Sequence, residues 1–169
     1  MIRSIAIALL ALLPTLALAG EDIAGAKDHP LLTRYPQSFI TAYKQGPDFV
    51  TFKVKTEDGK TETTPVKGKT TVITYAFEKN DSAGSAPVMT HFRDKASNPR
   101  PDELYYRSGA YLAGDPGEAT YKLMVDGKAV WIKVEPQDTF GSDKTGYVLT
   151  VVEASDEQPF GPKRRKGMP

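Results

Sequence analysis

The stretch that decides the fold spans residues 119–135 and reads ATYKLMVDGKAVWIKVE. Apolar and polar residues alternate on both sides of Asp126-Gly127, a dipeptide typical of a two-residue hairpin turn. Such a turn predicts an antiparallel hairpin with one continuous apolar face. The predicted pairs on that face are Leu123 with Val130, Tyr121 with Ile132, and Ala119 with Val134; on the other face they are Met124 with Ala129, Thr120 with Lys133, and Lys122 with Trp131, the last as a cation–π contact.

A second hairpin is predicted upstream, where residues 49–56 and 60–64 flank Asp58-Gly59. A short strand at 38–43 precedes it, and Gly46-Pro47 is expected to end that strand. Pro65 should end the pairing or lie at a sheet edge, because proline has no N–H to donate to a ladder. With a two-residue turn the predicted pairs are Glu57 with Lys60, Lys55 with Glu62, and Thr56 with Thr61.

The remaining segments predict a sheet with a single helix. Residues 70–78 are apolar on both faces, which indicates an interior strand; residues 147–152, also apolar on both faces, form the last predicted strand, and 104–106 and 110–112 are short strand candidates. Residues 86–96 predict the helix, with Ser85 as its cap, Pro87 in its first turn, and an apolar stripe of Val88, Met89, Phe92 and Ala96. We therefore expect an α+β fold, an antiparallel sheet of about six or seven strands with one covering helix.

The N-terminus has the three parts of a secretory signal peptide. Arg3 precedes an apolar run at 5–18, and Ala17-Leu18-Ala19 forms an A-x-A cleavage site. The run is short for a membrane span, and Pro14 interrupts it. The expected organisation is a signal peptide at 1–19, cleaved after Ala19, an extended lead-in at 20–38, a single domain at 39–154 and a flexible basic tail at 155–169.

Composition excludes several chemistries. The chain has no cysteine, which excludes disulfides, thiolate metal sites, cysteine nucleophiles and lipoprotein-type acylation. Cleavage after Ala19 removes Arg3 and no acid, so 21 basic side chains would face 21 acidic ones. Such a neutral chain has no long-range field to draw it to nucleic acid, and we expect a soluble product without a transmembrane segment.

Three stretches resemble a known module. The phrase Asp28-His29-Pro30-Leu31-Leu32-Thr33-Arg34-Tyr35-Pro36, the Gly68–Tyr75 stretch and the Gly146–Glu153 stretch are similar to an uncharacterised periplasmic module. That module forms the N-terminal half of envelope proteins whose C-terminal half is an OmpA-like, peptidoglycan-binding domain. The resemblance implies a Gram-negative envelope location and no known catalytic residues. No OmpA-like half follows here, so peptidoglycan binding is not carried over, and Asn98-Pro99-Arg100-Pro101 interrupts the module's helical stretch.

Few residues suggest chemistry. His29 and His91 have no spacing that joins them in a metal site, and both are expected at the surface. No nucleophile elbow or phosphate-binding loop is present, so no catalytic residue and no cofactor is assigned. Tyr105, Tyr106, Tyr111 and Trp131 could line a ligand groove, although packing explains them more simply. The sharpest charge feature is a basic cluster that could contact an anionic surface, Lys163, Arg164, Arg165 and Lys166.

These patterns lead to a hypothesis about function. We expect a non-catalytic periplasmic binding or interaction module of unknown ligand, with release from the cell as an alternative destination. Its partner would be an envelope protein, peptidoglycan or anionic lipid headgroups. The alternative from another class is a small exported hydrolase that uses His91 with a nearby acid or hydroxyl. A hollow that holds His91 and an acid within hydrogen-bond reach would favour this alternative.

Overall fold

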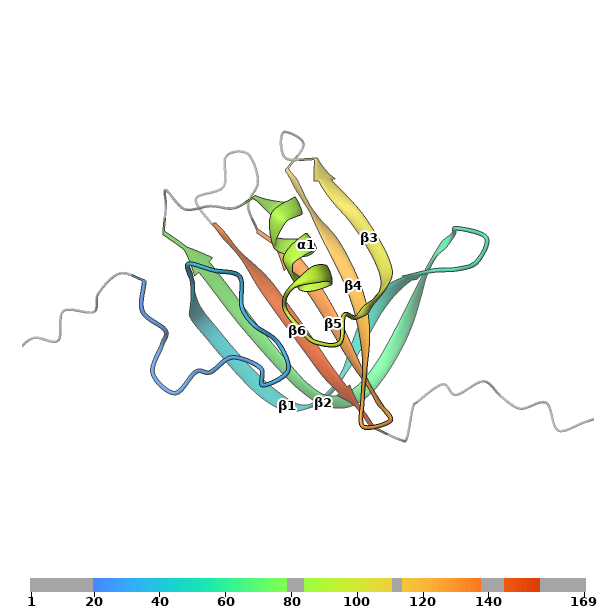
Figure 1. Ribbon diagram of the computed structural model, residues 1–169, viewed down its shortest axis with the longest axis horizontal. Coiled ribbons are helices and arrows are strands. Elements are labelled where there is room, and N and C mark those ends of the chain that lie inside the picture. Colours follow the sequence, from blue (N-terminus) through green and yellow to red (C-terminus); the bar gives the residue numbers. More distant parts are fainter. Residues whose placement is uncertain (1–19, 79–83, 111–113, 138–144, 156–169) are drawn as a thin grey trace, which may run out of the picture.

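The computed structural model describes residues 20–78, 84–110, 114–137 and 145–155. Six antiparallel strands form one sheet in the order β1-β2-β6-β5-β4-β3 (Figure 1). Their bounds are β1 Ser38–Lys55, β2 Thr61–Phe77, β3 Asp102–Ala110, β4 Asp115–Val125, β5 Lys128–Pro136 and β6 Gly146–Ala154, and the helix α1 spans Ser85–Asp94. The predicted cleavage site after Ala19 and the cluster Lys163–Lys166 lie outside the described residues.

The β4–β5 hairpin confirms the prediction from residues 119–135 pair by pair. Asp126 and Gly127 have φ angles of 49° and 77°. Positive φ at both central residues is the geometry of a type I′ turn, whose twist matches that of the strands. Lys122 Nζ lies 5.6 Å from the centroid of the Trp131 ring, which confirms the cation–π contact.

The β1–β2 hairpin differs from its predicted register by one residue, because its loop holds three residues instead of two. Thr56 N–H donates to Lys60 O, and Gly59 N–H donates to Thr56 O, so Lys55 pairs with Thr61 and not with Glu62. Gly59 has a φ of 79°, as in a type I turn followed by a left-handed residue.

The two prolines of this hairpin lie where a proline costs no ladder hydrogen bond. The expectation that Gly46-Pro47 ends a strand was wrong, because β1 continues from Ser38 to Lys55 along the edge of the sheet. Pro65 pairs with Thr51 in a part of β2 that β6 does not reach, since β6 joins β2 only from Gly68 onward. Pro65 therefore lies at an edge, as predicted.

Most of the hydrophobic core lies on one face of the sheet. Figure 1 shows a strongly curved sheet with α1 and residues 20–37 on its concave side. The apolar stripe of α1 is buried there as predicted, against inward side chains such as Tyr121 and Ile132. The predicted cap was wrong: Ser85 is the first helical residue, Gly84 occupies the cap position, and no side chain caps the helix.

A smaller apolar cluster covers part of the opposite face. Phe52 and Val66 of the β1–β2 ribbon pack against Val152 and Trp131. Val152 and Trp131 point away from the main core, because their neighbours Val151 and Ile132 point into it and strand side chains alternate. The ribbon thus folds across the back of the sheet, and its tip extends beyond β3 and β4 (Figure 1).

The predicted fold class was wrong. The protein is essentially all-β, since strands hold 60% and the helix 8% of the described residues. The physical reason is that no helical layer covers the sheet: one ten-residue helix shares the concave face with the non-helical residues 20–37. The two strands expected at 104–106 and 110–112 are one strand, β3, and residues 111 and 112 lie outside the described ranges. Within the described residues, no helix is long and apolar enough to cross a membrane.

Candidate functional site

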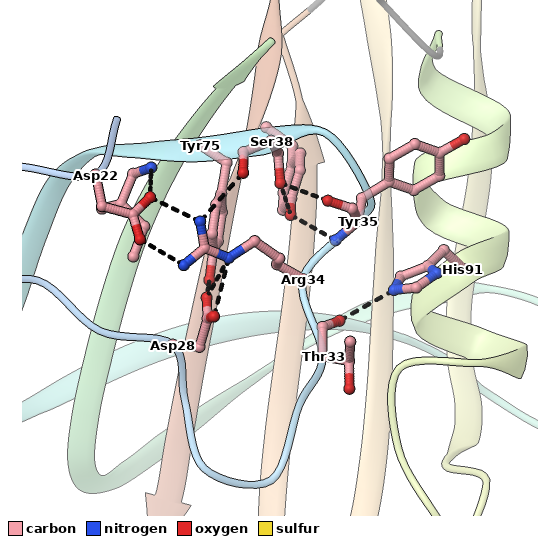
Figure 2. Close-up of polar contacts among 10 residues, drawn as sticks. Asp22, Asp28, Thr33, Arg34, Tyr35, Ser38, Tyr75 and His91 are labelled. Atoms are coloured by element: carbon pink, nitrogen blue, oxygen red, sulfur yellow. Dashed lines mark hydrogen bonds and ion pairs between the residues drawn. The ribbon is translucent and has the colours of Figure 1, made fainter. Parts of the chain in front are cut away.

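Residues 20–37, named the strap from here on, are fastened to the sheet by Arg34 (Figure 2). The Arg34 Nη atoms donate to both carboxylate oxygens of Asp22 at 2.6 and 2.7 Å, and Nε donates to Asp28 at 2.9 Å. Nη1 also donates to Ser38 O at 3.1 Å, at the start of β1. One planar guanidinium therefore joins two points of the strap to the first strand, which is the geometry that arginine suits best.

The charges in this cluster stabilise one another. The hydrogen bond from Arg34 lowers the pKa of the Asp22 carboxyl, and Asp22 in turn raises the pKa of Arg34. Burial and the hydrogen bond to Asp28 raise the pKa of Tyr75, whose hydroxyl donates to Asp28 at 2.7 Å. The Asp22 carboxylate, the Arg34 guanidinium and the Tyr75 phenol thus keep fixed protonation states at neutral pH.

Two stacked tyrosines carry this network into the core. The rings of Tyr75 and Tyr147 lie 4.6 Å apart at 20°. Tyr147 Oη accepts a hydrogen bond from Tyr35 N–H at 3.0 Å and lies 3.2 Å from Ser38 Oγ. Burial raises the pKa of Tyr147 to about 12. The segment at residues 28–36 therefore has a structural role, because its hydrogen bonds hold the strap against the concave face of the sheet.

A hollow of about 550 Å³ lies between the strap and α1 and is named the strap–helix hollow. Its polar lining residues are Tyr35, Thr90, His91 and Lys95. The remaining lining residues are Pro36, Ala86 and Pro87. Among the described residues that line it, none is acidic: Lys95 can only donate hydrogen bonds, and the Tyr35 and Thr90 hydroxyls can donate or accept them.

Contacts with Thr33 and Tyr35 of the strap fix the position of the His91 side chain. It is 8% exposed, which corrects the expectation of a surface histidine. Its Nε2 lies 3.0 Å from Thr33 O, and since a carbonyl oxygen can only accept, Nε2 carries the proton. The Tyr35 ring packs edge-on against the imidazole at 5.3 Å (Figure 2). Within the described residues, no carboxylate hydrogen-bonds to His91, so no observation favours the hydrolase alternative.

His29 is also buried, at 4% exposure, and does not lie at the surface as expected. Its Nδ1 accepts from Leu31 N–H at 3.4 Å, and its Nε2 lies 3.6 Å from Glu153 Oε1. Lys69 Nζ is 3.0 Å from the same carboxylate oxygen. Burial lowers the pKa of His29, and the Glu153 carboxylate only partly opposes this effect. The strap therefore contains a histidine that is neutral when folded.

Acid should weaken the fold through His29. The imidazole is protonated less readily in the folded chain than in the unfolded chain, where its pKa is near 6.5. Stability is then complete above about pH 6.5 and falls below it, by at most about 1.4 kcal/mol per pH unit. Urea unfolding at about pH 7.5 and about pH 5.5 should show a smaller loss for His29→Gln than for the native chain. Equal losses would contradict this assignment.

A second hollow, named the β1 groove, lies where β1 bends past β2. It measures about 710 Å³ and is lined by residues 45–49, by residues 67–69 and by Ser155. Phe49 is 58% exposed on its rim. No residue lines both this groove and the strap–helix hollow.

Three of the aromatic residues considered for a ligand groove, Tyr105, Tyr106 and Trp131, pack against other residues of the protein. Tyr105 is buried beneath the ammonium groups of Lys53 and Lys55, and Trp131 packs against Phe52 at 5.3 Å. Tyr111 lies outside the described residues. Across the described ranges, no group of three His, Cys, Asp or Glu side chains is arranged to hold a metal ion.

Sequence reasoning missed Tyr35, Thr90 and Lys95. A partial signal existed, because Thr90 and Lys95 are polar residues that flank the apolar stripe of the predicted helix. No signal in the sequence pointed to Tyr35, because Tyr35 contacts the helix only after the strap has folded across the sheet. Comparison with known proteins adds no assignment: no family model and no curated protein matches this sequence.

Proposed function

We propose that the protein is a non-catalytic binding module of the bacterial cell envelope, exported by its leader, and that the strap–helix hollow holds its ligand. The observation that carries this proposal is the convergence of Tyr35, Thr90, His91 and Lys95 on a hollow whose described lining residues include no acid. Its size falls within the usual range for small-molecule sites. The leader-like residues 1–19 and the resemblance to a periplasmic module support the location.

The donor set indicates the chemistry of the ligand. An ammonium and two hydroxyls complement acceptor oxygens, and carboxylate or phosphate oxygens form the strongest bonds with such donors. A carboxylate-bearing envelope component, such as a peptide stem of peptidoglycan, meets this requirement. The adjacent prolines Pro36 and Pro87 provide apolar surface for the rest of the ligand.

Rigidity of the strap supports binding in this hollow. Tyr35 contributes one wall, and its backbone N–H is bonded to Tyr147 Oη while its neighbour Arg34 is held by two carboxylates. A wall that is already ordered loses little conformational entropy when a ligand binds. The hydrogen bonds of Arg34 in Figure 2 thus order one wall of the hollow before a ligand binds.

Lys95→Gln should weaken ligand binding about tenfold, because it removes one charge-assisted hydrogen bond. The measurement is an amide NMR titration with two separate probes, muramyl dipeptide, which carries a carboxylate, and inorganic phosphate. Shift changes should gather on the amides of Tyr35 and of residues 86–95, apart from Pro87, which has no N–H. Lys128→Gln, at an exposed lysine of the β4–β5 hairpin, is the matched control and should bind like the native chain. Shifts scattered over the sheet, or equal affinity of both variants, would refute the proposal.

A further inference from the structure

We propose that acid opens the strap: protonation of His29 releases residues 20–37 from the sheet and removes one wall of the strap–helix hollow. The consequence for ligand binding rests on the proposed function. The opening of the strap does not, because it is a property of the folded chain that can be measured without a ligand.

The strap–helix hollow exists only while the strap lies against α1. Two of its lining residues, 35–36, belong to the strap, and the other lining residues lie within 86–95. Thr33 joins the two walls, because its N–H donates to Ala96 O at 2.7 Å and its carbonyl oxygen accepts from His91 Nε2 at 3.0 Å. When the strap leaves the helix, these bonds break and one wall is lost. Ligand affinity then scales with the fraction of chains whose strap is docked.

The contacts of His29 suit the neutral imidazole. The side chain is buried between the strap and the sheet, at 4% exposure. Its Nδ1 accepts from Leu31 N–H at 3.4 Å, and its Nε2 lies 3.6 Å from Glu153 Oε1. One tautomer satisfies both contacts, with the proton on Nε2. A second proton would bind to Nδ1 and face the Leu31 N–H, so that a donor would oppose a donor.

Charged side chains of β6 and β2 face this imidazole. Glu153 attracts an imidazolium, whereas Lys69 repels it and lies 3.0 Å from the same carboxylate oxygen. The Glu153 side chain is 41% exposed, so solvent weakens its attraction. Asp28, the preceding strap residue, is bound to Arg34. Burial lowers the pKa of His29, so the docked strap binds a proton less readily than the open strap, and acid favours the open strap.

The other anchors of the strap persist in mild acid. His91 Nε2 carries a proton in the neutral tautomer and in the imidazolium, so it donates to Thr33 O in either state. The hydrogen bond from Arg34 keeps the pKa of Asp22 below its ordinary value, so this ion pair also remains. Acid therefore acts on the strap through His29.

Hydrogen exchange of the full chain, measured by NMR at about pH 7.5 and about pH 5.5, tests the opening of the strap. The amides of Ile23, Thr33 and Tyr35 are hydrogen-bonded in the docked strap. Their protection factors should be lower than those of β4 and β5. They should fall at pH 5.5 by up to about tenfold, the limit for a histidine whose pKa is 6.5 in the open strap. A strap that exchanges as slowly as β4 and β5 at pH 5.5 would overturn the inference, since it would open only when the whole domain unfolds.

Three variants assign the effect to one side chain. His29→Gln should abolish the fall in protection, because the amide can accept from Leu31 N–H and donate to Glu153 but does not titrate. His91→Gln is the matched control and should show the same fall as the native chain. Glu153→Gln should enlarge the fall, because it leaves the imidazole with Lys69 alone of these two charges, and it decides the matter should His29→Gln not fold. A fall that persists in His29→Gln, or a smaller fall in Glu153→Gln, would contradict the role of His29.

Muramyl dipeptide provides a second readout. At about one hundred times its dissociation constant, a ligand that binds only the docked strap should raise the protection of the strap amides by up to about a hundredfold. Binding that leaves this protection unchanged would refute the coupling between the strap and the hollow. Acid opening that depends on His29 supports the inference even where the peptide does not bind, and that absence of binding refutes the proposed function alone.

Discussion

Replacement of Gly68 by alanine is expected to lower the free energy of unfolding by about 3 kcal/mol. An added Cβ would lie 2.1 Å from the carbonyl oxygen of Glu153 and 2.8 Å from its carbonyl carbon. Both atoms belong to the backbone of β6, so no side chain can rotate away to relieve the contact. β6 would have to move from β2 where Gly68 pairs with Ala154.

Gly46→Ala is the matched control for this substitution. Gly46 lies in the neighbouring strand β1, two residues from Asp48, which pairs with Gly68. A Cβ at Gly46 would meet no atom within 4 Å. Alanine there should change stability by less than about 1 kcal/mol, in the stabilising direction, because it reduces the freedom of the unfolded chain. Urea unfolding of both variants decides the matter, and similar losses would show that crowding at Gly68 is unimportant.

Replacement of Arg34 by methionine is expected to cost about 2 kcal/mol. It removes the hydrogen bonds to Asp22, Asp28 and Ser38 O and leaves two neighbouring carboxylates without their cation. Removal of one partner from a buried ion pair costs about 3–5 kcal/mol. The side chains here are 24%, 33% and 37% exposed for Arg34, Asp22 and Asp28, and solvent screening reduces that cost.

In the Arg34→Met variant, the strap should open locally more often than the whole domain unfolds. Hydrogen exchange at the amides of Tyr35 and Ile40, which donate to Tyr147 Oη and to Asp22, should accelerate more than exchange within β4 and β5. Arg100→Met is the control, since Arg100 is 64% exposed and, among the residues that the structure describes, forms an ion pair only with Asp94. Its stability should change by less than about 0.5 kcal/mol. Equal effects of both variants would mean that the Arg34 cluster does not hold the strap.

Prediction from the sequence succeeded where the interacting residues lie near one another along the chain. The β4–β5 register follows from alternation around Asp126-Gly127, and the buried stripe of α1 follows from helical spacing. The β1–β2 register failed by one residue, because Asp-Gly suits both a two-residue loop and a three-residue loop with glycine at its left-handed position. The break expected at Gly46-Pro47 failed because β1 lies at the sheet edge, where proline is tolerated.

The candidate site was much less predictable. His29 and His91 were expected at the surface, and both are buried because the strap and α1 close over them. The hollow between Tyr35 and Lys95 joins residues about sixty positions apart, and no spacing along the chain announces such a contact. The resemblance at residues 28–36 singled out this segment of the strap, but it did not indicate that Arg34 joins the strap to the first strand.

The amino-acid sequence by itself determined the β4–β5 hairpin with its register, the turn at Asp58-Gly59 and the buried stripe of the helix, since turn chemistry and the spacing of apolar residues act between near neighbours. Only the tertiary structure decided that the protein is all-β, that residues 20–37 take the place of a helical layer, and that the strap–helix hollow and the β1 groove form. The physical reason is that Arg34 needs Asp22, Asp28 and Ser38 at once, and only the folded sheet with its strap brings all three within hydrogen-bond distance.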